Sequence, residues 1–113
     1  MKLLLYFLGI ATPLQAFGLS PAAQEFMSIS RQLEPAQCEK RQLRRRIALA
    51  EAERRDADAR VARARFGALD KDPKTARLEK RLAELEPLLK RSPDPDDLPA
   101  ISLQQREAFY RCE

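Results

Sequence analysis

Residues 36–66 contain neither proline nor glycine, and this unbroken stretch constrains the fold more than any other feature of the chain. Its commonest residues are arginine, alanine, glutamate, glutamine and leucine, which all favour helix. Leu43, Ile47 and Ala50 follow one another at spacings typical of a coiled-coil seam, and only Arg54 interrupts the continuation of this pattern. We therefore expect one long helix over 36–68.

A second helical stretch pairs with the first. Residues 67–73 carry the strongest turn signals in the chain, and Thr75 can cap a helix over 76–91. The leucines of this helix recur at seam spacing, and leucines opposite alanines suit two closely packed antiparallel helices. We predict an all-α fold: a long antiparallel, coiled-coil-like helical hairpin with short flanking N- and C-terminal helices, clasped by one disulfide.

The flanking segments are shorter. Ser20 and Pro21 can start a helix as N-cap and first residue, which predicts a short amphipathic helix within 17–34. Pro35 either ends that helix or opens the next. We assign residues 35–113 to the hairpin unit, which includes an extended, acidic, proline-rich connector at 92–100 and a last helix after it.

The first sixteen residues have the layout of a secretory signal peptide. A basic start at Lys2 precedes an apolar run over 3–11, which Pro13 breaks before the small residue Ala16. A membrane span needs about 20 apolar residues, so no integral span is expected. We expect a signal peptide over 1–16, cleavage after Ala16, and a periplasmic or secreted protein.

Cys38 and Cys112 are the only cysteines, and export would place them in an oxidising compartment. We predict one intramolecular disulfide between them, with a link between two chains and a reactive thiol as the alternatives. In the predicted hairpin, the connector carries the last helix back to the base of the hairpin. That path brings Cys112 to the level of Cys38.

The residues that are missing exclude most catalytic chemistry. The chain has no histidine, which removes the usual neutral-pH base and the commonest metal ligand. Two cysteines without histidine cannot complete a structural zinc site. We expect no enzyme activity, no catalytic residue, no metal and no cofactor.

Two groups of residues are candidates for binding. The first is a basic block that could bind a partner or an anion: Lys40, Arg41, Arg44, Arg45 and Arg46. The second is an apolar, partner-facing set on the first helix: Phe26, Ile29 and Leu33. The basic block is alternatively a solvated helix face, or it is neutralised by Asp94, Asp96 and Asp97 of the connector.

These features predict an exported, non-catalytic interaction or scaffold subunit of the bacterial cell envelope. Its expected partner is another envelope protein, with a homo-oligomer as the alternative. A second hypothesis is a binder of anionic surfaces, such as lipid head groups or an acidic polymer, through residues 40–46. Nucleic acid is not an expected partner, because only Phe66 supplies a stacking ring beside the basic stretch.

The layout also resembles phage inner-membrane spanins. It combines an N-terminal apolar segment, a basic coiled-coil stretch and the C-terminal residues Arg111, Cys112 and Glu113. Spanins keep a full transmembrane anchor, and this chain departs from them at residues 13–16. If the N-terminal segment is not cleaved, the resemblance implies a membrane-anchored coiled coil.

Overall fold

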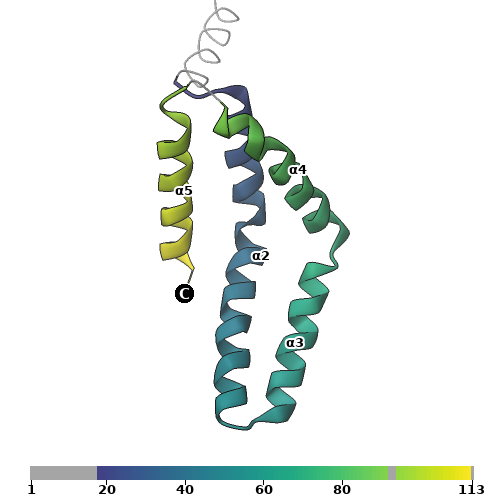
Figure 1. Ribbon diagram of the computed structural model, residues 1–113. Coiled ribbons are helices and arrows are strands. Elements are labelled where there is room, and N and C mark those ends of the chain that lie inside the picture. The colour runs from purple at the N-terminus through teal and green to yellow at the C-terminus, as the bar shows by residue number, and fades with distance from the viewer. Residues whose placement is uncertain (1–17, 92–93, 113) are drawn as a thin grey trace, which may run out of the picture.

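The computed structural model describes residues 18–91 and 94–112, and this part of the chain is helical without a strand. Its helices are α2 (Pro21–Ala52), α3 (Asp56–Asp70), α4 (Pro73–Lys90) and α5 (Asp97–Arg111). α2 is central, with α3 and α4 on one side and α5 on the other (Figure 1). The predicted all-α hairpin with one disulfide is confirmed. The expected signal peptide and its cleavage site lie outside the described residues.

The first helix begins where the sequence predicts. Ser20 is the N-cap of α2, and its Oγ accepts a hydrogen bond from the backbone N–H of Ala23 at 3.1 Å. Pro21 follows as the first helical residue, where a missing N–H removes no helical hydrogen bond. Two adjacent residues therefore fix this start.

Pro35 does not end α2. The helix runs through it, so the boundary expected at this residue is wrong and the short helix predicted within 17–34 is the first part of α2. Proline inside a helix costs about 3 kcal/mol through a lost hydrogen bond and a steric clash. Pro35 is exposed, so water can reach the carbonyl that lacks a donor, while buried Leu33 packs on another side of the helix.

The chain reverses direction directly after α2 through a Schellman motif. The backbone N–H of Arg55 donates to the carbonyl of Ala50 at 2.7 Å, and that of Arg54 donates to Glu51 at 3.2 Å. Arg54 has φ = 58°, in the left-handed region that this motif requires at its position. The single helix predicted over 36–68 is therefore wrong, because α3 already runs back along α2 (Figure 1).

Replacing Arg54 with glycine is expected to raise the free energy of unfolding by about 0.5–1 kcal/mol. A residue with a Cβ is strained in the left-handed region, and glycine relieves that strain although it makes the unfolded chain more flexible. Urea denaturation measures the change. The control is Arg60→Gly at an exposed position within α3, where glycine should lower stability by about 1 kcal/mol. Equal losses in both variants would contradict the assignment of strain to Arg54.

α3 and α4 together form a bent return limb. α3 ends at Asp70 and α4 begins at Pro73, so the turn expected over 67–73 is a bend between two helices that both lead back along α2 (Figure 1). Asp72 caps α4, because its carboxylate accepts a hydrogen bond from the backbone N–H of Thr75 at 2.9 Å. The expected cap, Thr75, is therefore the donor and Asp72 is the acceptor.

α5 runs beside α2 in the same direction (Figure 1). Three hydrogen-bonded pairs join the two helices: Ser20 with Asp97, Met27 with Gln104, and Glu34 with Arg111. The two residues of every pair are 77 positions apart, and successive pairs are about two helical turns apart. The two helices therefore keep one register along most of α5.

The connector before α5 lies at the start of α2. The carboxylate of Asp97 accepts from the backbone N–H of Ser20 at 3.0 Å and from its hydroxyl at 2.7 Å. Asp97 is fully buried and is the first residue of α5, so helix begins inside the segment predicted to be extended over 92–100. The predicted position of the connector was wrong because the hairpin turns earlier in the chain than expected.

The buried core is thin and lies along α2. One cluster, where α2, α4 and α5 meet, consists of Ala23, Leu89 and Ile101. A second cluster, between α2 and α4, consists of Ile29, Leu33 and Leu85. Toward the hairpin turn, the buried residues of α2 and α3 are mostly alanines: Ala50, Ala59 and Ala62. Because alanine buries little area, each leucine in these clusters carries a large share of the apolar stabilisation.

Candidate functional site

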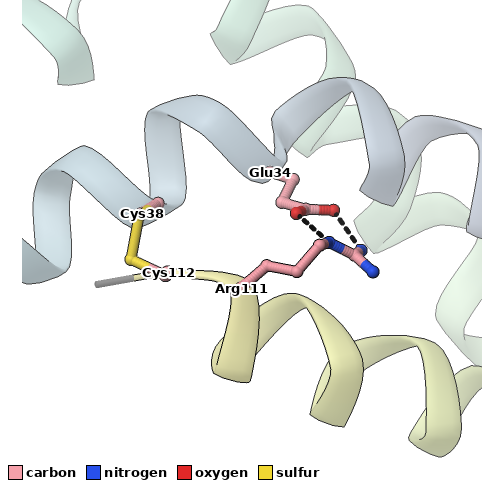
Figure 2. Close-up of a disulfide and its surroundings, with 4 residues drawn as sticks. All are labelled: Glu34, Cys38, Arg111 and Cys112. Carbon is pink, nitrogen blue, oxygen red and sulfur yellow. Dashed lines mark hydrogen bonds and ion pairs between the residues drawn. A yellow bond between two sulfur atoms is a disulfide. The ribbon is translucent and has the colours of Figure 1, made fainter.

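A covalent and an ionic link fasten the end of α5 to the middle of α2. Cys38 on α2 and Cys112, directly after α5, form a disulfide with their Cα atoms 5.5 Å apart, which confirms the predicted pairing (Figure 2). Beside it, Arg111 donates two hydrogen bonds to the carboxylate of Glu34, at 2.9 and 2.8 Å. A bidentate pair of this kind fixes orientation as well as position.

Several carboxylates on α2 are held in their charged form by arginines of other helices. The hydrogen bonds from Arg111 hold the pKa of Glu34 below its ordinary value of 4.5, against a smaller opposing effect of partial burial. Since the unfolded chain has the ordinary pKa, this pair stabilises the fold above about pH 4.5 and its contribution is lost as the pH falls through the lowered pKa. Two other pairs act likewise: Glu25 with Arg81, and Glu39 with Arg65.

Acidification from about pH 6 to about pH 3 is therefore expected to lower the urea midpoint of unfolding. In an Arg111→Gln variant the decline should be shallower, because Glu34 loses the donor that lowers its pKa. Urea titrations at each pH measure both slopes. The control is Arg60→Gln, which removes the same charge from an exposed residue without an ion pair among the described residues. A slope that is equally steep in both variants would contradict the role of the Glu34 pair.

Carboxylates of the return limb neutralise part of the basic block. Lys40 is buried, with 8% of its surface exposed, and its Nζ contacts the carboxylates of Asp70 and Glu79. Arg46 donates from Nε to Asp58 at 3.0 Å. The partners come from α3 and α4, so these two charges are matched within the chain and are less available to an anionic surface.

Two carboxylates of the acidic connector lie away from the basic block. Asp97 binds Ser20, and a carboxylate oxygen of Asp96 lies against Gly18, at the start of α2. The alternative that Asp96 and Asp97 neutralise the basic block is therefore wrong, because the chain reverses at Arg54 and so brings these two residues to the start of α2.

Arg41 and Arg44 lie over aromatic rings, as Lys40 does, but they differ from Lys40 in their contacts with carboxylates. The guanidinium of Arg41 lies over the ring of Phe109 at 5.3 Å, and that of Arg44 lies over the ring of Phe66 at 5.2 Å. Within the described ranges neither forms an ion pair with a carboxylate. Arg45, the remaining member of the block, is exposed. Aromatic faces attract these cations without neutralising their charge.

Two hollows lie along one face of α2, the first between α4 and α5 and the second beside α4. The first, of about 220 Å³, is lined by Phe26, Ser30, Glu34, Gln37, Arg41, Leu82, Gln104, Gln105 and Ala108. The second, of about 290 Å³, is lined by Gln37, Lys40, Arg41, Arg44 and Glu79. Because they share Gln37 and Arg41, we describe them together as the α2 groove. Its apolar end holds Phe26 and its basic end holds Arg44.

The groove changes the interpretation of the apolar candidates. Ile29 and Leu33 are buried against Leu85 of the same chain, so the expectation that they face a partner is wrong. They face inward because α4 packs on the side of α2 that carries them. Phe26 packs against both core clusters but is only partly buried, and it lines the α2 groove. It stays a candidate for contact with a partner.

The outer side of α5 carries apolar residues that the sequence did not mark as a site. Four large side chains are each more than half exposed: Leu98, Leu103, Phe109 and Tyr110. The rings of Phe109 and Tyr110 contact each other edge to face, with centroids 5.8 Å apart. Their spacing in the sequence fits a helix face, but nothing in that pattern tells a buried face from an exposed one.

No protein-family model matches this chain, and neither does a curated protein or a solved structure. In the part of the chain that the structure describes, no helix combines the length and apolar character that crossing a membrane requires. The same residues contain no cluster of three or more histidine, cysteine or acidic side chains that could hold a metal ion.

Proposed function

We propose that this chain is an exported, non-catalytic helical protein that acts as an interaction or scaffold subunit in the bacterial cell envelope. The apolar outer surface of α5 carries the proposal, because Leu103, Phe109 and Tyr110 are 52%, 57% and 73% exposed. Exposed apolar side chains gathered on one element are typical of contact surfaces, and aromatic residues are enriched there.

The way in which α5 is attached to α2 also supports this proposal. This helix buries little of itself, yet Asp97 anchors its first turn and the disulfide anchors its end. Links at both ends hold the exposed aromatic residues in a fixed position, which lowers the entropy lost when a partner binds.

Two features support the proposed location in the cell envelope. The layout of residues 1–16 is typical of an export signal, and a disulfide is characteristic of proteins in oxidising compartments. Mass spectrometry of the intact exported protein under non-reducing conditions tests this location. The mass reports cleavage after Ala16, the disulfide and any covalent dimer together. An uncleaved chain would instead favour the anchored, spanin-like coiled coil.

Site-specific crosslinking in cells tests the interaction. A photoreactive residue at position 110 should capture a defined envelope protein, and one at position 60 on the exposed side of α3 should not. Leu103→Ser with Tyr110→Ser should abolish the complex and leave the helix content unchanged. The proposal fails if the mature protein is monomeric and position 110 yields no crosslinked partner.

A further inference from the structure

We infer that the α2 groove binds a helix of a partner protein that has one apolar end and one acidic end. This inference rests on the proposed function and deepens it, because it names the chemistry of the partner. The outer surface of α5 and the α2 groove meet where Phe109 contacts Arg41, but variants at Leu103 and Tyr110 change only the first surface and variants at Ser30 and Arg44 change only the second.

The shape of the groove fits a helix. On α2 its lining residues recur every three or four positions from Phe26 to Arg44, so the floor is one continuous helix face about 27 Å long. Leu82 on α4 and Gln105 on α5 lie on opposite walls. Beside the second hollow only α4 contributes a wall, through Glu79. A floor made by one helix with flanking helices beside it is the setting in which a further amphipathic helix packs.

The apolar end can take apolar side chains. Phe26 on α2, Leu82 on α4 and Ala108 on α5 are each partly buried and meet in the first hollow. Water would leave this surface when a leucine or phenylalanine of the partner entered, which gives the favourable hydrophobic contribution to binding.

The basic end can take carboxylates. Arg41 and Arg44 line the second hollow and contact aromatic rings, whereas the carboxylate in the same hollow, Glu79, already contacts Lys40. Neither guanidinium forms an ion pair in the described chain, although the charge of Arg41 acts on nearby Glu34, which is already bound by Arg111. Both groups therefore favour glutamate or aspartate on the docked helix, in hydrogen bonds strengthened by charge. The two ends of the groove therefore set the direction of the bound helix, with its acidic end toward the hairpin turn.

A synthetic peptide of defined pattern tests this. The probe is a fluorescently labelled helical peptide of about five turns, with leucines on one face of one half and glutamates on the same face of the other half. Fluorescence anisotropy measures its binding to the oxidised full chain. We expect saturable binding that weakens about tenfold or more when the glutamates become glutamines.

Variants of the protein locate the binding. Arg41→Gln with Arg44→Gln should weaken the acidic peptide about tenfold or more, to the level of the glutamine peptide. The charge-matched control Arg60→Gln with Lys80→Gln, at exposed residues outside the groove, should bind like the wild type. Ser30→Tyr places a bulky ring in the first hollow and should block both peptides. Circular dichroism checks that each variant keeps its helix content.

Three results would overturn the inference. The first is equal binding of the acidic and glutamine peptides. The second is equal weakening in the groove pair and the control pair. The third is binding to phosphatidylglycerol vesicles that requires Arg41 and Arg44 while the peptide does not bind, which would assign the basic end to a membrane surface. If the peptide does not bind but position 110 still crosslinks a partner, this inference fails and the proposed function stands. If the peptide binds but position 110 crosslinks no partner, the proposed function alone is rejected.

Discussion

Replacing Cys38 and Cys112 together with serine is expected to lower the free energy of unfolding by about 4–5 kcal/mol in the chain-entropy model. The two cysteines are 74 positions apart, so the disulfide closes most of the described chain into one loop and removes many conformations of the unfolded state. With few buried side chains to oppose it, this loss is a large fraction of the stability of a small domain. Urea denaturation of the oxidised wild type and the double variant measures it.

Two controls separate loop closure from local damage. The reduced wild-type protein should lose as much stability as the serine variant, because both lack the cross-link. Hydrogen exchange should show that the amides of α5 lose protection before those of α2, because α5 packs on α2 with few buried residues. Equal stability of the oxidised wild type and the serine variant would contradict the prediction.

Replacing Leu85 with alanine is expected to cost about 3 kcal/mol. Leu85 is 1% exposed and packs between α2 and α4 with Ile29 and Leu33, so its truncation leaves a cavity in this cluster. A thin core has few neighbouring side chains that can collapse into such a cavity. Thermal and urea unfolding both report the loss.

The matched control lies on the same helix. Leu88 is 45% exposed, so Leu88→Ala changes helix propensity and composition in the same way but removes little buried area. Its effect should stay within about 0.5 kcal/mol. A loss below about 1 kcal/mol for Leu85→Ala would mean that the cluster contributes much less than its burial indicates.

The features of the fold that could be predicted from the sequence are those set by adjacent residues, by a single pair of residues or by composition. Ser20 and Pro21 marked the start of α2 because capping and proline geometry need only adjacent residues. Cys38 and Cys112 left few alternatives because there were only two cysteines in a chain with an export signal. Helical content followed from composition, which is averaged over many residues and so tolerates local error.

The turn was not predictable in the same way. A left-handed C-cap is usually recognised by glycine, but Arg54 occupies that position here. The stronger signals at Gly67 and Pro73 mark a real break between helices, yet proline and a capping aspartate say nothing about whether the next helix continues or reverses. The interruption of the apolar seam at Arg54 was the one signal of the reversal.

The α2 groove could not be predicted from the sequence, because the predicted turn was in the wrong place. A turn at 67–73 places the connector against the basic block. The observed turn places it at Ser20 instead, and Arg41 and Arg44 then form no ion pair in the described chain. The positions of α4 and α5 along α2 are decided by packing over the whole length of these helices. No short sequence motif records such packing. The residues of the site were therefore identifiable, but their grouping was not.

The position of the disulfide also decides how the protein responds to mechanical load. A pulling force that enters upstream of Cys38 and leaves downstream of Cys112 passes through the S–S bond, because that bond is the shortest covalent path between the two sides. The hairpin turn, the return limb and all of α5 lie inside the loop and carry none of the tension. In the oxidised state, stretching can unravel the part of α2 before Cys38, while the intervening helices stay shielded until the bond is reduced.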